Sequence, residues 1–269
     1  MQTVDVWAQI TTERMAREPW LEPLLRWTGH AGGIAPPSVQ STLAAMDAAE
    51  VELALIAGWH GPQGSLISND EVAEAVAEAP DRLRGVATVD LTRPMDGVRE
   101  IRRRADEGFV GVRVIPWLWD LPPNDRRYYP VYAACVDAGL PFCTQIGHTG
   151  PLKRSETGRL LPYLEDVMLD FPELVVVGGH VGFPWLDELV TMTVKFPNFY
   201  VDTSAYAVHR LPAQFVEWMK GIGQERVMFG TNWPMLSPAR CLARLDDLGL
   251  SSEQREAFLS GTARRVFRL

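Results

Sequence analysis

The stretch RVMFGTNWP, residues 226–234, decides the fold. Its apolar run 227–230 has the composition of a buried strand, and Thr231 and Asn232 follow directly before a Trp-Pro pair ends the pattern. In a barrel of parallel strands, the chemistry lies at the face where the strands end. Asn232 is therefore expected at a functional face, although its neutral amide cannot take up a proton at neutral pH.

Seven further strand-like runs precede this stretch and alternate with helical patterns. The expected strands are 2–7, 51–57, 83–90, 109–115, 140–145, 174–179 and 199–204, and the expected helices are 38–49, 69–79, 94–107, 129–138, 160–171, 185–195 and 212–221. This alternation predicts a (β/α)8 TIM barrel of the α/β class, with residues 1–269 as one domain. The segment 19–37, rich in Trp, Gly and Pro, is expected as a short insertion over the barrel mouth.

Composition narrows the range of partners. The chain has 269 residues, of which 46% are hydrophobic, and a net charge of −8. One large core fits this length, and the acidic balance argues against nucleic acid and anionic membranes as partners. Three cysteines without CxxC spacing indicate reduced thiols. The start of the chain has neither a basic region nor an apolar signal segment, so a cytoplasmic protein with a small-molecule substrate is expected.

Three motifs resemble those of the amidohydrolase superfamily, in particular its amidohydrolase-related branch, which is similar to aminocarboxymuconate-semialdehyde decarboxylase. FGTNWP resembles the LxFGSDxP of the last barrel strand, and His180-Val181-Gly182 resembles the HxG of the sixth. Residues 262–267, TARRVF, resemble the closing NAxRxF. The resemblance implies the barrel fold and, by analogy, a possible homodimer.

The same resemblance exposes the loss of a metal site. The family's DxHxH, its fifth-strand histidine and its last-strand aspartate hold a metal, but the matching positions here are Trp7, Gln9, Gln145 and Asn232. Divalent ions prefer imidazole, thiolate or carboxylate ligands. The sequence thus predicts no tight catalytic metal and no other cofactor, and it leaves open a different, weaker site made of His148, His180 and Asp202. The fifth strand has a second possible alignment, in which His148 takes the position of the histidine.

Two histidines at strand ends are the candidate acid/base groups. His180 and His148 are expected to converge with Asn232, while Gln145 and Gln9 offer amide hydrogen bonds to a substrate. Arg113 lies in an apolar run, where it either forms a structural ion pair or binds a carboxylate. Asp202, which follows the seventh strand, is a further candidate.

Tryptophans also follow several predicted strands. Such residues are usually part of the core, but their recurrence at strand ends indicates an aromatic mouth for a hydrophobic or aromatic substrate. Two of them lie in the segment 116–125, which has three prolines and is expected as a loop. The candidate substrate-binding tryptophans are Trp7, Trp59, Trp117, Trp119 and Trp233.

Three functions are compatible with these residues. The first is a metal-independent hydrolase of a hydrophobic or aromatic carboxylic ester, lactone, thioester or amide, in which His180 activates water and His148 assists the leaving group. The second is a non-oxidative decarboxylase or other lyase acting on an aromatic or unsaturated carboxylate. The third is a catalytically silent barrel that binds its ligand. Release of carbon dioxide, as opposed to incorporation of solvent oxygen, separates the first two.

Overall fold

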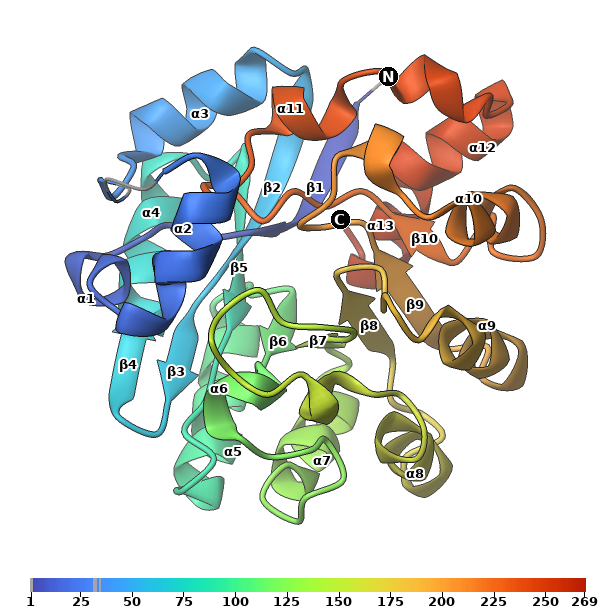
Figure 1. Ribbon diagram of the computed structural model, residues 1–269. Helices are drawn as coiled ribbons and strands as arrows, with labels where there is room; N and C mark the ends of the chain where they lie inside the picture. The colour runs from blue at the N-terminus through green and yellow to red at the C-terminus, as the bar shows by residue number, and fades with distance from the viewer. Residues whose placement is uncertain (1, 31–32, 34) are drawn as a thin grey trace.

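A ring of eight parallel strands forms the centre of the molecule (Figure 1). The structure is a computed structural model and describes residues 2–30, 33 and 35–269. Successive strands are neighbours: β1 (Thr3–Ala8), β2 (Val51–Ala57), β5 (Leu83–Ala87), β6 (Gly111–Arg113), β7 (Phe142–Gln145), β8 (Val176–Gly179), β9 (Phe199–Asp202) and β10 (Val227–Met228). The predicted TIM barrel is confirmed.

Hydrogen bonds between the two ends of the sheet close the ring. The Val6 N–H donates to the Phe229 carbonyl at 3.0 Å, and the Asn232 N–H donates to the Trp7 carbonyl at 2.8 Å. β10 itself has only two residues, but these bonds continue the pairing beyond it. Asn232 is thereby held against the carboxyl end of β1.

Helices connect the strands and surround the barrel. They are α3 (Val39–Asp47), α4 (Asn69–Glu78), α5 (Pro94–Asp106), α7 (Tyr129–Ala138), α8 (Tyr163–Asp170), α9 (Leu186–Lys195), α10 (Ala213–Lys220), α11 (Pro238–Leu242), α12 (Ser252–Glu256) and α13 (Thr262–Phe267). Shorter helical segments are η2 (Glu156–Gly158), η3 (Val208–Arg210), η4 (Leu245–Leu248) and η5 (Ala257–Gly261). The seven predicted helices are all present, and α4 shows a local cause: Ser68 and Glu71 form a capping box at its start.

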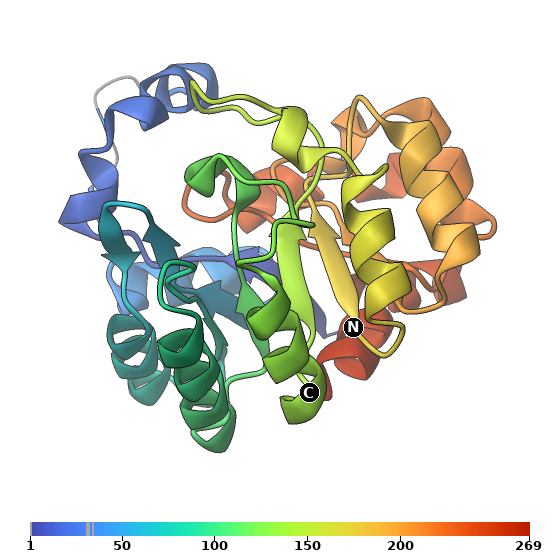
Figure 2. The ribbon, with the colours of Figure 1, turned by 90° about the horizontal axis from the view of Figure 1, so that it is seen from below.

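The predicted insertion lies at the carboxyl-terminal end of the barrel. It contains η1 (Pro19–Leu21) and α2 (Glu22–Thr28), and α1 (Glu13–Ala16) precedes it. Figure 2 shows these elements at the same end as the loop that follows β7, away from the two chain termini. The Leu152 N–H of that loop donates to the Trp20 carbonyl at 3.4 Å. The insertion therefore covers one side of the mouth.

Two elements differ from the sequence prediction. β3 (Trp59–Gly61) and β4 (Gly64–Ile67) form an antiparallel hairpin after β2, and α6 (Pro116–Trp119) forms within the segment expected as a loop. Both are too short for a periodic pattern, and a proline at the first turn of α6 is compatible with a helix start. In the part of the chain that the structure describes, no helix is long and apolar enough to span a membrane.

Candidate active site

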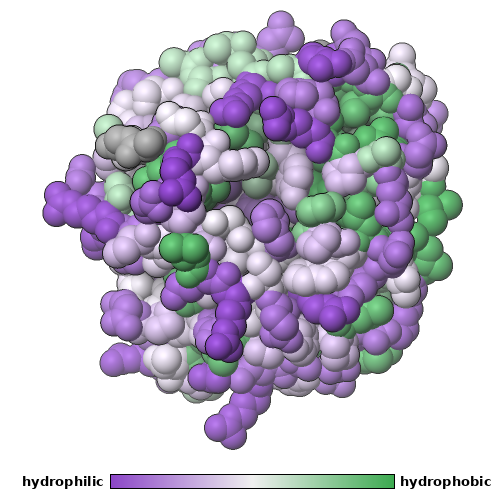
Figure 3. All heavy atoms as spheres, in the orientation of Figure 1, coloured by the Kyte–Doolittle hydropathy of each residue, from purple (hydrophilic) through white to green (hydrophobic). Residues whose placement is uncertain are grey.

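A cavity of about 890 Å³ opens at the carboxyl-terminal face of the barrel. Its walls come from strand ends on one side and from the insertion on the other, and Figure 3 shows this face hollowed near its centre. The volume lies within the range of ligand-binding pockets. The polar side chains that line it are Gln9, Arg26, Gln145, His148, His180, Tyr206, Arg210 and Asn232.

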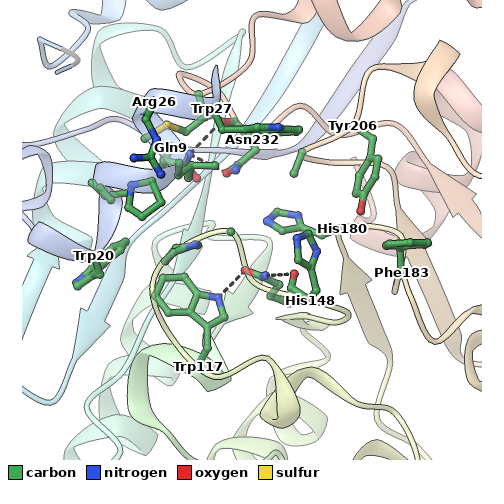
Figure 4. Close-up of a pocket in the computed structure, with 18 of the residues that line it drawn as sticks. Gln9, Trp20, Arg26, Trp27, Trp117, His148, His180, Phe183, Tyr206 and Asn232 are labelled. Carbon is green, nitrogen blue, oxygen red and sulfur yellow. Dashed lines mark hydrogen bonds between the residues drawn. The ribbon is translucent and has the colours of Figure 1, made fainter. Parts of the chain in front are cut away.

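Two imidazoles face this cavity. His180 directly follows β8, and His148 lies in the loop after β7; Figure 4 draws their rings close together. Nδ1 of His180 lies 2.6 Å from the Ser204 hydroxyl, and Trp7 packs against the ring at 5.0 Å between centroids. Burial, together with the charge of Arg113 and with His148, lowers the pKa of His180 to about 3. Its imidazole is therefore neutral at physiological pH.

The backbone is strained where these strands end. His180, Val181, Ala205 and Asn232 all have φ between 66° and 73°, the left-handed region that side chains other than glycine rarely adopt. Val181 is β-branched, for which this conformation is least favourable. A strained backbone persists only where the surrounding packing maintains it, and such residues are concentrated at functional sites. His180, Ala205 and Asn232 of this cluster line the cavity.

The amide side chains are already bonded to one another and to the protein. Gln9 Nε2 donates to Asn232 Oδ1 at 3.1 Å. Gln145 Oε1 accepts a hydrogen bond of 2.6 Å from the Trp117 indole, and its Nε2 donates to the His148 carbonyl at 3.2 Å. These contacts fix the amides as neutral hydrogen-bonding groups on the cavity floor. The contacts form two separate pairs, Gln9 with Asn232 and Gln145 with the His148 backbone, and all four residues line the same cavity.

This donor set does not fit the metal that the family pattern implies. Neutral amides and an indole stand at the ligand positions, with one imidazole among them if His148 takes the place of Gln145, and the Asn232 and Gln145 oxygens already accept hydrogen bonds. Within the described residues, no group of three His, Cys, Asp or Glu side chains is arranged to hold a metal ion. Divalent ions of the kind used in such barrels require anionic or imidazole ligands.

The predicted tryptophans divide into two groups. Trp59 and Trp117 line the cavity, with Trp20 stacked on Trp59 at 6.5 Å and edge-on to Trp117 at 5.1 Å. Trp119 instead stacks on His60, and the Trp233 indole N–H donates to Thr42. These last two lie outside the cavity lining.

Trp7 lies beneath the cavity floor. Its ring packs so closely on β8 that a Cβ at Gly179 would lie 2.4 Å from it, so only glycine fits there. The aromatic wall thus consists of Trp20, Trp59 and Trp117, and Trp7 supports it from below.

Arg113 and Asp202 also lie beneath the cavity floor. The Arg113 guanidinium packs over the Trp7 ring at 3.8 Å and donates to the Val6 and Ala8 carbonyls at 3.3 Å. Burial lowers the pKa of Arg113 to about 10 and raises that of Asp202 to about 6. The expected direct contact between Arg113 and a substrate carboxylate is not available in this arrangement.

Sequence reasoning missed the residues that come from the insertion and from the loop after β9. Trp20, Trp27 and Arg26 line the cavity from the insertion, and Tyr206 and Arg210 line it from the opposite loop. The Trp-rich composition of the insertion was a usable signal for the first group. Tyr206 and Arg210 come shortly after β9. They could have been found by considering residues several positions beyond the strand end as well as those that directly follow it.

The fold and site define a TIM barrel whose cavity is lined by two histidines and, among the described residues, by no carboxylate. The amidohydrolase family model matches residues 6–269, and the chain belongs to this family.

Known relatives share this architecture. A gamma-resorcylate decarboxylase of Rhodococcus jostii (strain RHA1) is 26% identical over 255 residues, which are 75% of each chain. An uncharacterized TIM-barrel protein of Bordetella bronchiseptica superposes with a TM-score of 0.84 at 23% identity, over 100% of this chain and 99% of the other. A dihydroxybenzoic acid decarboxylase of Polaromonas sp. JS666, solved with bound manganese and 2-nitroresorcinol, superposes with a TM-score of 0.74 at 19% identity, over 100% and 97%.

Proposed function

We propose that this protein is a decarboxylase of an aromatic carboxylate that works without a metal. The observation that carries the proposal is the pair of histidines inside an aromatic cavity: among the described residues that line it, none is Asp or Glu. A cavity of this kind suits a flat anionic ligand. The relatives named as decarboxylases of aromatic acids favour the same substrate class.

The reaction needs one proton and no oxidant. The ring carbon that bears the carboxylate takes a proton, the bond between these two carbons breaks, and the carboxylate leaves as carbon dioxide. A bound carboxylate raises the pKa of a neighbouring imidazole, because opposite charges stabilise each other. His180, neutral in the empty cavity, takes up a proton as the substrate binds and delivers it to the ring carbon, with His148 as its exchange partner with solvent.

The amides and Ser204 orient the reacting groups. Gln9 and Asn232 offer hydrogen bonds to oxygen substituents of the ring, and Ser204 fixes the ring of His180 through Nδ1. The similar decarboxylase of Polaromonas sp. JS666 was solved with bound manganese. The residues here do not fit such an ion, so every step is assigned to the side chains of this chain.

Hydrolysis is the second candidate function. His180 is neutral and can accept a proton, but a pKa lowered to about 3 makes it a weak base for the activation of water, so this candidate stands second. In this scheme His180 removes a proton from water, and the amides of Gln9 and Asn232 polarise the carbonyl of an ester or lactone. Incorporation of solvent oxygen into the product distinguishes this reaction from decarboxylation.

The test measures release of carbon dioxide from a panel of aromatic acids by chelator-treated protein. We expect turnover with less than about 0.2 metal ion per chain, because no anionic ligand set is present. His180→Asn should lower turnover by at least about 10²-fold, the usual contribution of a positioned acid/base group. His30→Asn is the matched control, since His30 lies outside this cavity.

Three outcomes contradict the proposal. Stoichiometric metal that is retained through chelation and is needed for turnover would refute metal independence. Full activity of His180→Asn would assign the proton transfer elsewhere. Saturable binding of many aromatic acids and esters without any product would instead favour a barrel that only binds its ligand.

A further inference from the structure

Charge in the cavity is divided between its mouth and its floor. The chain as a whole carries a net charge of −8, yet the charged side chains that line the cavity, within the described residues, are two arginines and no carboxylates. Arg26 comes from α2 of the insertion and Arg210 from η3 after β9. A local excess of positive charge in an acidic protein indicates an anionic ligand.

Both arginines lie at the mouth. The Arg26 side chain is 70% exposed and pairs with Glu22 of the same helix at 3.6 Å, a separation that leaves its guanidinium free to turn toward a ligand. Arg210 is exposed, and among the described residues no carboxylate forms an ion pair with it. Figure 4 places Arg26 and Tyr206, which precedes Arg210 by four residues, on opposite sides of the cavity.

The floor, in contrast, carries no matched positive charge. His180 is neutral, and the amides of Gln9, Gln145 and Asn232 are uncharged. The Arg113 guanidinium is covered by Trp7 and bonds to backbone carbonyls, so it forms no direct ion pair with a ligand on the floor, although its charge acts on His180. A carboxylate that lies against this floor therefore has no charged partner until His180 takes up a proton, and that proton uptake costs free energy because burial lowers the pKa of His180 to about 3.

The walls between the two ends are apolar and long. Trp20, Trp59 and Trp117 form one side of a cavity of about 890 Å³, which is large for a single aromatic ring. A ligand that fills it reaches from the histidines to the arginines. One end of such a ligand lies against the uncharged side chains of the floor, and the other end lies near the two arginines of the mouth.

We infer that the substrate is an aromatic acid with a second anionic group, which Arg210 and Arg26 bind at the mouth while the reacting carboxylate lies on the neutral floor. This inference rests on the proposed decarboxylation and specifies its substrate class. Binding energy gained at the remote group offsets the cost of protonating His180 beside the reacting carboxylate, and transfer of that proton with loss of carbon dioxide removes both charges. A monoacid lacks the group that provides this binding energy.

The test compares two probes, biphenyl with a carboxylate at both ends and biphenyl with a carboxylate at one end only. Calorimetry should show that the diacid binds at least about tenfold more tightly, in keeping with a charge-assisted hydrogen bond. Arg210→Met and Arg26→Met should each reduce this preference toward equality and should make diacid binding less dependent on salt.

Arg17→Met is the matched control. Arg17 also pairs with a glutamate four residues away, Glu13, at 3.1 Å and lies in the same region, but it does not line the cavity. The Arg17→Met variant should prefer the diacid over the monoacid by the same factor as the wild-type chain. Equal binding of the two probes, or an unchanged preference in both arginine variants, refutes the inference.

Failure of the inference is distinct from failure of the proposed function. The binding comparison requires no turnover, so it stands even if neither probe loses carbon dioxide. Conversely, monoacids could release carbon dioxide as fast as diacids do, with the same rates in the arginine variants as in the wild-type chain. That result would support decarboxylation and would refute the anion site at the mouth.

Discussion

Ser204 determines how the ring of His180 is held. Its hydroxyl lies 2.6 Å from Nδ1, and its own N–H donates to Asp202 Oδ1 at 2.8 Å, so the chain after β9 links the buried carboxylate to the imidazole. Ser204 is fully buried, and water cannot easily replace its hydroxyl. In the proposed reaction, Ser204 is a positioning residue that acts through His180.

Ser204→Ala should lower kcat by at least about tenfold and change KM little, because a buried hydrogen bond of this kind is worth about 1–3 kcal/mol. Nitrogen NMR of His180 should show a changed tautomer ratio, a readout that a purely structural role of Ser204 would not affect. Ser204→Cys, which keeps the size and a weak donor, should be intermediate. A proportional loss of kcat in both variants with an unchanged tautomer would contradict the positioning role.

At the scale of elements, the insertion completes the aromatic wall. η1 brings Trp20 into contact with Trp59, which begins the β3–β4 hairpin, and with Trp117 of α6. Three irregular segments that are distant in sequence therefore form one surface. The barrel strands supply the polar floor, and these short elements supply most of the apolar wall.

Trp20→Ala should weaken binding of the biphenyl diacid by about tenfold, because loss of about 60 Å² of apolar ligand contact corresponds to about 1.5 kcal/mol. The melting temperature should change little, since Trp20 belongs to the insertion and not to the barrel. Trp233→Ala is the control: its indole bonds to Thr42 outside the cavity. If Trp233→Ala weakens binding as much as Trp20→Ala, the wall has been assigned incorrectly.

The elements also explain how much could be predicted from the sequence. The alternation of buried strands and amphipathic helices was sufficient for the barrel, because burial on both faces gives continuous apolar runs. His180, Gln9, Gln145 and Asn232 could be placed at one face because strand ends converge there.

Other parts of the site could not be placed from the sequence. Arg113 and Trp7 point below the cavity floor, and that depends on packing against Gly179, which no periodic pattern encodes. Arg26 and Arg210 come from short helical segments whose path over the barrel is set by tertiary contacts.

At the scale of the whole molecule, buried charge lies in the centre of the barrel. Asp5 of β1 accepts hydrogen bonds from the Thr231 hydroxyl at 2.6 Å and from the Thr231 and Trp7 N–H groups at 3.0 and 3.1 Å. These bonds join the first strand to the chain after the last one. Burial nevertheless outweighs them and raises the pKa of Asp5 to about 7.

The sign of the resulting pH dependence follows from proton binding. Between about pH 4 and pH 7 the folded chain keeps a proton on Asp5 that the unfolded chain has released, so the contribution of Asp5 to the free energy of unfolding falls as the pH rises. A rise in pKa from 3.8 to about 7 corresponds to about 4 kcal/mol. Above about pH 8 the contribution is constant.

Asp5→Asn isolates this effect, because the amide keeps one oxygen for the two N–H donors and can donate to Thr231 through its nitrogen. Relative to the wild-type chain, the variant should gain up to about 4 kcal/mol of stability between pH 4 and pH 8. Asp202 and His180 also have shifted pKa values, but both are common to the two chains, so their contributions cancel in the difference except for the repulsion between Asp202 and Asp5. Chemical denaturation of both chains at a series of pH values measures this difference in the free energy of unfolding. A difference that is independent of pH would mean that Asp5 is ionised in the folded barrel and that its three hydrogen bonds outweigh its burial.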